Sequence, residues 1–164
     1  MNLKSCSLLL LCLAVPLTQA KSLGASRTPK GVPLEFTCGA REKLPSLPKD
    51  TAQDIAEILD SGLSTVQPTI CAVSLRNGKS GEALTLSYVM HPAYCGSHGC
   101  ALIASRKEAD GTIRDVGPDL VLNLDIEPTG RQTALRAAPL KSSFPDLLYQ
   151  GLTISWDGGK YRVH

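Results

Sequence analysis

The sequence predicts a mainly β protein of the α+β class: an antiparallel sheet of about six to eight short strands, stabilised by disulfides, with one packed helix near residues 51–61. Three observations lead to this prediction. One stretch carries apolar residues at helical spacing. Beyond it, short runs alternate apolar and polar residues and end at turn-forming residues. Four of the six cysteines follow the first 20 residues. We expect a single globular domain over residues 32–164.

The N-terminal segment has the layout of a secretory signal peptide. A lysine precedes the apolar run Leu8–Leu17, and Ala20 ends a small-residue cleavage site. The run is too short to span a bilayer comfortably. A lipid anchor at Cys12 is the alternative, but such a site needs a small residue just before the cysteine, and a leucine stands there. We therefore expect residues 1–20 to be a signal peptide, residues 21–31 a flexible lead-in, and the product to be exported without stable membrane insertion.

The first strand is expected at Val32–Cys38, just before a glycine. The helix follows in "PKDTAQDIAEILDSG", where Asp50 is placed to cap its start and Gly62 follows its last periodic residue. Its apolar residues share one face: Ala52, Ile55, Ala56 and Leu59. That face predicts a helix lying against the sheet.

The rest of the chain is typical of strands joined by turns. The expected strands are Thr69–Leu75, Ala83–His91, Cys100–Lys107, Thr112–Gly117, Asp119–Ile126, Leu152–Trp156 and Lys160–Val163. Two pairs of these strands form hairpins, one with its tip at Glu108–Gly111 and the other closed by "DGG" before Lys160. The segment Glu127–Gly151 is ambiguous, since it could hold a strand, a helical turn and a loop.

Export into an oxidising compartment favours two disulfides among the remaining cysteines, Cys38, Cys71, Cys95 and Cys100. Cys95 and Cys100 lie close in sequence with two glycines between them, so we expect them to close a tight loop. Cys38 would then pair with Cys71 and tie the first strand to the strand after the helix. The other two pairings stay open, because sequence alone does not decide connectivity.

Composition and spacing argue against several classes of function. The formal net charge is +2 and the basic residues form no run, so we expect no nucleic-acid partner. The segment His91–Cys100 holds two histidines and two cysteines, but it lacks the usual paired zinc-binding spacing, and export favours oxidation of both thiols. Ser97 and His98 are adjacent, and no G-x-S-x-G elbow is present. We therefore expect neither enzymatic activity nor a metal or cofactor.

Two segments, "YCGSHGCALIASRK" and "GLTISWDGGKY", combine a short cystine loop, a following strand and a late tryptophan-containing ending. In these segments the chain resembles bacterial periplasmic immunity proteins that neutralise type VI secretion amidase effectors. The resemblance implies a periplasmic location and, as partner, a secreted peptidoglycan-degrading cell-wall amidase. It also implies an inhibitor that blocks the Cys/His active-site cleft of that enzyme.

Loop chemistry indicates two partner-binding segments. In the loop Tyr94–Gly99, Ser97 and His98 are polar groups able to reach a catalytic thiol or imidazole, and the tyrosine is an aromatic anchor. In the following hairpin the candidate contacts are Ser105, Arg106, Lys107 and Asp110. The alternative is a secreted enzyme or small-ligand-binding protein with a concave pocket in the His91–His98 region. An envelope protein without a single partner is a third possibility.

Overall fold

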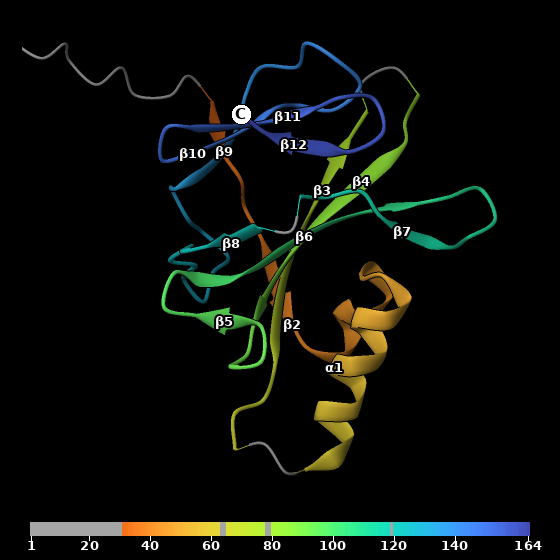
Figure 1. Ribbon diagram of the computed structural model, residues 1–164, viewed down its shortest axis with the longest axis vertical. Helices are drawn as coiled ribbons and strands as arrows, with labels where there is room; N and C mark the ends of the chain where they lie inside the picture. The colour runs from red at the N-terminus through yellow and green to blue at the C-terminus, as the bar shows by residue number, and fades with distance from the viewer. Residues whose placement is uncertain (1–30, 63–64, 78–79, 119) are drawn as a thin grey trace, which may run out of the picture.

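Two antiparallel β-sheets, one α-helix and one 3-10 helix make up the described part of the chain (Figure 1). The computed structural model describes residues 31–62, 65–77, 80–118 and 120–164. The predicted signal peptide, residues 1–20, and the lead-in as far as residue 30 lie outside the described residues. The elements are, in chain order, β1 (Val32–Pro33), β2 (Thr37–Gly39), η1 (Arg41–Ser46), α1 (Lys49–Ser61), β3 (Thr69–Arg76), β4 (Ala83–Met90), β5 (Cys95–Gly96), β6 (Gly99–Lys107), β7 (Ile113–Asp115), β8 (Leu120–Leu122), β9 (Leu135–Ala137), β10 (Leu147–Tyr149), β11 (Leu152–Trp156) and β12 (Tyr161–Val163).

The predicted mainly β, antiparallel and disulfide-stabilised fold is confirmed. The smaller sheet has the strand order β1-β9-β10-β11-β12; the larger has β2-β3-β4-β6-β5, with β7 and β8 also paired to β6. The chain thus forms two sheets where one was expected, with twelve strands in the described ranges. Several strands are only two or three residues long. Among them β5, β9 and β10 contain too few alternating positions to be recognised from their pattern.

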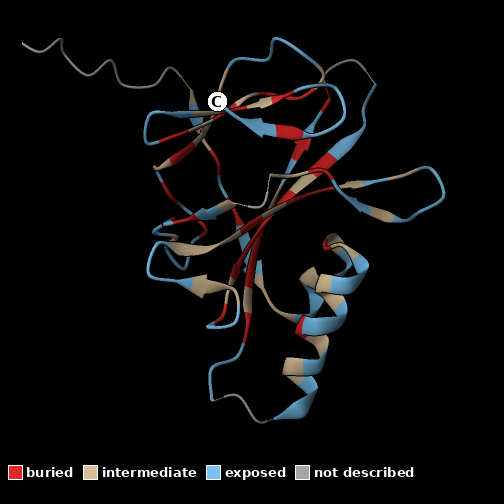
Figure 2. Cartoon of the chain, viewed as in Figure 1, coloured by how far each residue is buried: buried red, intermediate tan, exposed pale blue. Residues whose placement is uncertain are grey.

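The main core lies between the two sheets. Cys71 on β3 and Tyr88 on β4 point into it. Their neighbours Ile70 and Val89 point to the opposite face, as the two-residue period of a strand requires. Figure 2 shows buried positions along the central strands of the larger sheet and along the smaller sheet. The smaller sheet contributes Leu135, Leu147, Tyr149, Ile154, Trp156 and Tyr161.

The helix α1 covers the outer face of the larger sheet. Ile55 is fully buried there and packs in one cluster with Ile70 and Val89. Burying one such side chain contributes about 1.5–3 kcal/mol to stability. The packed helix of the sequence prediction is therefore present, and its apolar face holds it on the sheet.

The two ends of α1 agree with the prediction to different degrees. Gly62 ends the helix with φ +61°, the left-handed conformation expected of it. The helix begins at Lys49 after Pro48, so Asp50 lies inside the first turn and is not the cap. The negative charge of Asp50 still interacts favourably with the positive end of the helix dipole. No helix in the described ranges is long and apolar enough to cross a bilayer.

The predicted first strand, Val32–Cys38, is two strands in different sheets. β1 pairs with β9 in the smaller sheet, and β2 pairs with β3 in the larger one. Between them Leu34 and Phe36 are buried, and their N–H groups donate to the carbonyls of Leu135 and Gly130. The chain crosses from one sheet to the other while still extended, which an alternating pattern does not reveal.

Both preferred disulfides are present, and each joins residues directly opposite one another on paired strands. Cys38–Cys71 links β2 to β3, and Cys95–Cys100 links β5 to β6. Both predicted hairpins are confirmed as β6–β7 and β11–β12. The ambiguous segment Glu127–Gly151 contains β9 and β10.

Candidate functional site

The hairpin formed by β5 and β6 ends in a two-residue turn, Ser97-His98. Below the turn Gly96 and Gly99 lie opposite each other, and the disulfide joins the next pair of residues, whose Cα atoms are 3.9 Å apart. Strand pairing and a covalent bond therefore fix the base of the turn. The predicted loop is a stapled hairpin with a narrow tip.

Ser97 and His98 are both exposed at this tip. The Ser97 Oγ atom lies 3.0 Å from His98 Nδ1. Within the described part of the chain, neither side chain makes another hydrogen bond, and no carboxylate orients the imidazole as a catalytic triad requires. The arrangement offers a hydroxyl group and the imidazole Nε2 atom to a partner.

Tyr94 lies at the base of the hairpin instead of its tip. Its side chain is half-buried and packs against the cluster beneath α1. Burial and, to a lesser degree, the negative charge of Asp54 raise the pKa of its hydroxyl. The Tyr94 N–H donates to the carbonyl of His91, and the Tyr94 carbonyl accepts from the N–H of Ala101. Tyr94 therefore positions the hairpin on the body of the protein.

The two histidines of the alternative hypothesis lie in different surroundings. His91 is 8 % exposed, and its Nδ1 atom accepts a hydrogen bond from the N–H of Ala93, so it helps to close the turn before β5. His98 is exposed at the tip. The sulfur atoms of Cys95 and Cys100 are bonded to each other and are not free to ligate zinc. Among the described residues, no three His, Cys, Asp or Glu side chains gather in a group that could hold a metal ion.

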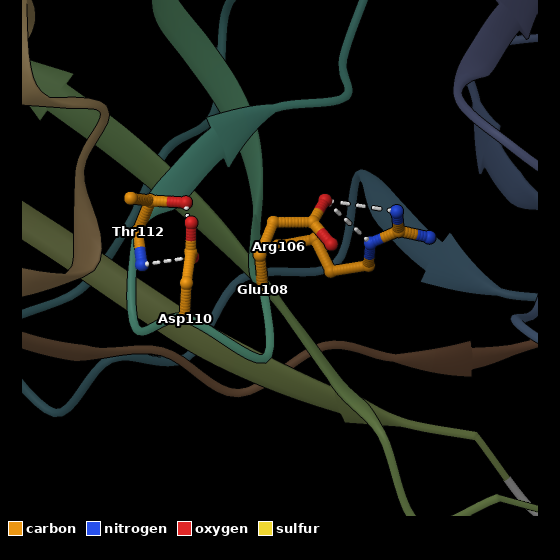
Figure 3. A network of polar contacts seen from close by, with 4 residues as sticks. All are labelled: Arg106, Glu108, Asp110 and Thr112. Atoms are coloured by element: carbon orange, nitrogen blue, oxygen red, sulfur yellow. Dashed lines mark hydrogen bonds and ion pairs between the residues drawn. The ribbon is translucent and has the colours of Figure 1, made fainter.

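The second predicted segment is the β6–β7 hairpin. Figure 3 shows two separate polar pairs there, with Arg106 donating to Glu108 and Thr112 donating to Asp110. Asp110 Oδ1 accepts from the Thr112 hydroxyl at 2.6 Å and from the Thr112 N–H at 2.9 Å, and these bonds lower the pKa of its carboxyl. Asp110 thus shapes the turn, while Lys107 is exposed beside it.

Ser105 is buried and does not belong to the exposed surface. Its hydroxyl donates to the carbonyl of Ser46 at 2.6 Å and so ties η1 to the larger sheet. Along β6 its neighbours Ala104 and Arg106 point to the other face of the sheet. Its side chain is therefore not presented at the surface of the hairpin.

The two predicted segments lie at opposite ends of β6. The strand runs from Gly99 to Lys107, which at about 3.3 Å per residue separates them by roughly 26 Å. Figure 1 shows the β5 turn and the β6–β7 tip on opposite sides of the larger sheet. The structure does not combine them into one patch, so a small cleft can engage only one of them.

A group of basic residues beside Arg106 was not predicted from the sequence. Arg114, Lys160 and Arg162 line the same concavity of about 390 Å³. In the structure Arg114 lies opposite Arg106. The predicted tip Glu108–Gly111 would instead have placed Ile113 there, so this pair was not found from the sequence. The contribution of β12 was not predicted either, because it depends on how the last hairpin packs against β7.

Comparison with known protein families, with curated proteins and with solved structures finds no match. The resemblance to periplasmic immunity proteins therefore stays a prediction. The arrangement of the stapled tip is the observation on which a functional proposal can be built.

Proposed function

We propose that the protein is an exported inhibitor, an immunity protein of the periplasm, that binds a secreted peptidoglycan-degrading amidase and inserts the Ser97-His98 tip into its Cys/His active-site cleft. It acts by binding and not by catalysis of its own. The observation that supports the proposal is the exposed, disulfide-stapled tip, together with the resemblance of its surrounding sequence. Both disulfides are compatible with an oxidising, exported location.

The shape of the tip suits entry into a cleft. Gly96 and Gly99 flank the turn, so only two side chains widen its end. A Cβ atom placed on Gly96 would meet nothing within 4 Å, which leaves one side of the tip open to a partner. Because the disulfide already fixes the turn, little conformational entropy is lost when it is bound.

The chemistry of the tip suits a Cys/His active site. Catalytic cysteine and histidine side chains are hydrogen-bonding groups, and the Ser97 hydroxyl and the His98 imidazole are partners for either. Neither group is occupied by the rest of the described chain apart from their contact with each other. The tip can therefore fill the cleft and satisfy its polar groups.

The proposal is tested with the double variant Ser97→Ala/His98→Ala and a cognate amidase, found as the product of an adjacent gene or by pull-down from periplasm. Inhibition of peptidoglycan cleavage and Kd are measured. We expect Kd to rise by at least about 30-fold, the cost of losing hot-spot contacts. The control variant Arg131→Ala/Lys141→Ala changes two exposed residues elsewhere and should inhibit as the natural chain does. Unchanged inhibition by the tip variant, or the absence of any complex with such an amidase, would refute the proposal.

A further inference from the structure

Four basic side chains gather where the β6–β7 hairpin meets the β11–β12 hairpin. They line a concavity of about 390 Å³ together with two aspartates and two glycines. The charged residues are Arg106, Arg114, Asp115, Asp157, Lys160 and Arg162. The N–H of Tyr161 donates to the carbonyl of Val116 at 2.8 Å, so the two walls of this basic pocket are joined.

Both aspartates of the basic pocket are engaged by their own turns. Asp157 accepts a bond from Arg162, and it also accepts from the N–H groups of Gly159 and Lys160, each at 2.9 Å. Asp115 accepts from the backbone N–H two residues later at 2.8 Å. The aspartates therefore shape the walls and neutralise only part of the positive charge.

Two of the four cations have no acidic partner among the described residues. Arg106 is paired with Glu108, and Arg162 with Asp157. Arg114 and Lys160 form no ion pair within the described ranges. Arg114 lies directly opposite Arg106 in the β6–β7 register. Like charges in that relation destabilise a hairpin, so the stability of the strands gives no reason for the second arginine.

We propose that the basic pocket is a binding site for an oxyanion, the carboxylate or phosphate group of a multivalent anion. A guanidinium group presents planar, paired N–H donors that match the oxygen atoms of either group. Glu108 and Asp157 hold Arg106 and Arg162 in place, while Arg114 and Lys160 supply the charge that the anion neutralises. Binding removes the repulsion between the two facing arginines.

The size of the pocket restricts the ligand further. A concavity of about 390 Å³ lies within the usual range for small-molecule sites, so it accommodates a compact anion or an anionic headgroup. The pocket lies at the opposite end of β6 from the Ser97-His98 tip. The inference therefore goes beyond the proposed inhibitor function and does not rest on it.

The test measures binding of pyrophosphate and citrate to the mature chain by calorimetry and by amide chemical shifts. A second arm measures cosedimentation with vesicles containing phosphatidylglycerol. We compare the natural chain with Arg114→Gln/Lys160→Gln and with the charge-matched control Arg131→Gln/Lys141→Gln. We expect shifts at residues 114–115 and 157–162, and Kd at least about tenfold higher in the pocket variant alone. Binding of free anions alone identifies a soluble ligand, and binding of vesicles a headgroup.

A charge reversal separates the site from a general effect on folding. Arg114→Glu places opposite charges across the hairpin, so it should raise the urea midpoint of unfolding while abolishing anion binding. Three results would overturn the proposal: no binding to free anions or vesicles, equal loss in the control variant, or normal binding by Arg114→Glu.

Discussion

At the scale of single residues, Tyr161 carries a hydroxyl group that is almost completely buried. It is 1 % exposed, its hydroxyl donates to the carbonyl of Pro145 at 2.8 Å, and its ring meets Trp156 edge to face. Burial and then the charge of Asp146 raise the pKa of this hydroxyl well above its usual value near 10. Above pH about 10 the native state therefore keeps the Tyr161 proton, while the unfolded chain loses it.

This shift predicts a loss of stability in alkali. The free energy of unfolding should not depend on Tyr161 below pH about 10, where both states are protonated, and should fall as the pH rises further, because only the unfolded state ionises. Urea unfolding between about pH 8 and pH 11 measures the decline. Tyr161→Phe should be less stable at pH 8 by about 1 kcal/mol, since a hydrogen bond is lost, yet its decline should be shallower. Equal slopes in both proteins would contradict this assignment.

Individual residues also show what the sequence does and does not reveal. The pairing of Cys95 with Cys100 was predicted, because a short glycine-containing separation brings the two cysteines together. The burial of Ser105 was not predicted, since a serine before two basic residues is typical of a surface. In the structure Ser105 is buried, and its hydroxyl donates to the carbonyl of Ser46 at the end of η1. Tyr94 was predicted to be an aromatic anchor of the loop, and its side chain packs against the cluster beneath the helix.

At the scale of elements, the β5–β6 hairpin depends on a close approach to the end of β8. Gly99 has φ +123°, and a Cβ atom there would lie 1.9 Å from the carbonyl oxygen of Leu122. Gly96, opposite Gly99, faces open space. We expect Gly99→Ala to lower the free energy of unfolding by about 2–4 kcal/mol through clash and backbone strain. Gly96→Ala should change it by less than about 0.5 kcal/mol. Similar urea midpoints for the two variants would show that β8 does not crowd the turn.

The long elements and the short strands β7, β8 and β12 were predicted from the sequence, whereas β5, β9 and β10 were not assigned. β3, β4 and β6 are each eight or nine residues long and largely apolar, and α1 has an apolar face that ends at Gly62. The segment Val32–Cys38 also alternates, but its two halves pair with strands far apart in the sequence. Local pattern carries no information on such partners, so neither the split of this strand nor the second sheet could be predicted.

At the scale of the whole molecule, β6 separates the possible binding surfaces. The stapled tip lies at one end and the basic pocket at the other, where Arg106 of β6 and Arg162 of β12 line the same concavity. The sequence identified Ser97, His98 and Arg106 as candidate contacts because loop chemistry is local. It could not show that they are roughly 26 Å apart or that the last hairpin completes the pocket. Two surfaces so far apart can bind different partners at the same time.

The two disulfides should contribute differently to folding and to binding. Cys38–Cys71 closes 33 residues and Cys95–Cys100 only 5, so loop-closure entropy predicts about 3.7 and 2 kcal/mol of stabilisation respectively. We expect Cys38→Ala/Cys71→Ala to be the less stable variant in urea. Inhibition of the proposed amidase should instead be weaker in the variant without Cys95–Cys100, because only this shorter disulfide fixes the tip.

Kd for the proposed amidase partner is measured at urea concentrations well below both unfolding transitions, where each variant is folded. Removal of Cys95–Cys100 should raise Kd by about tenfold or more as the turn becomes disordered, and removal of Cys38–Cys71 should leave Kd within about twofold. An equal effect of both changes would mean that affinity follows overall stability. A larger effect of the Cys38–Cys71 change would indicate that the partner contacts the β2–β3 edge of the sheet and not the tip.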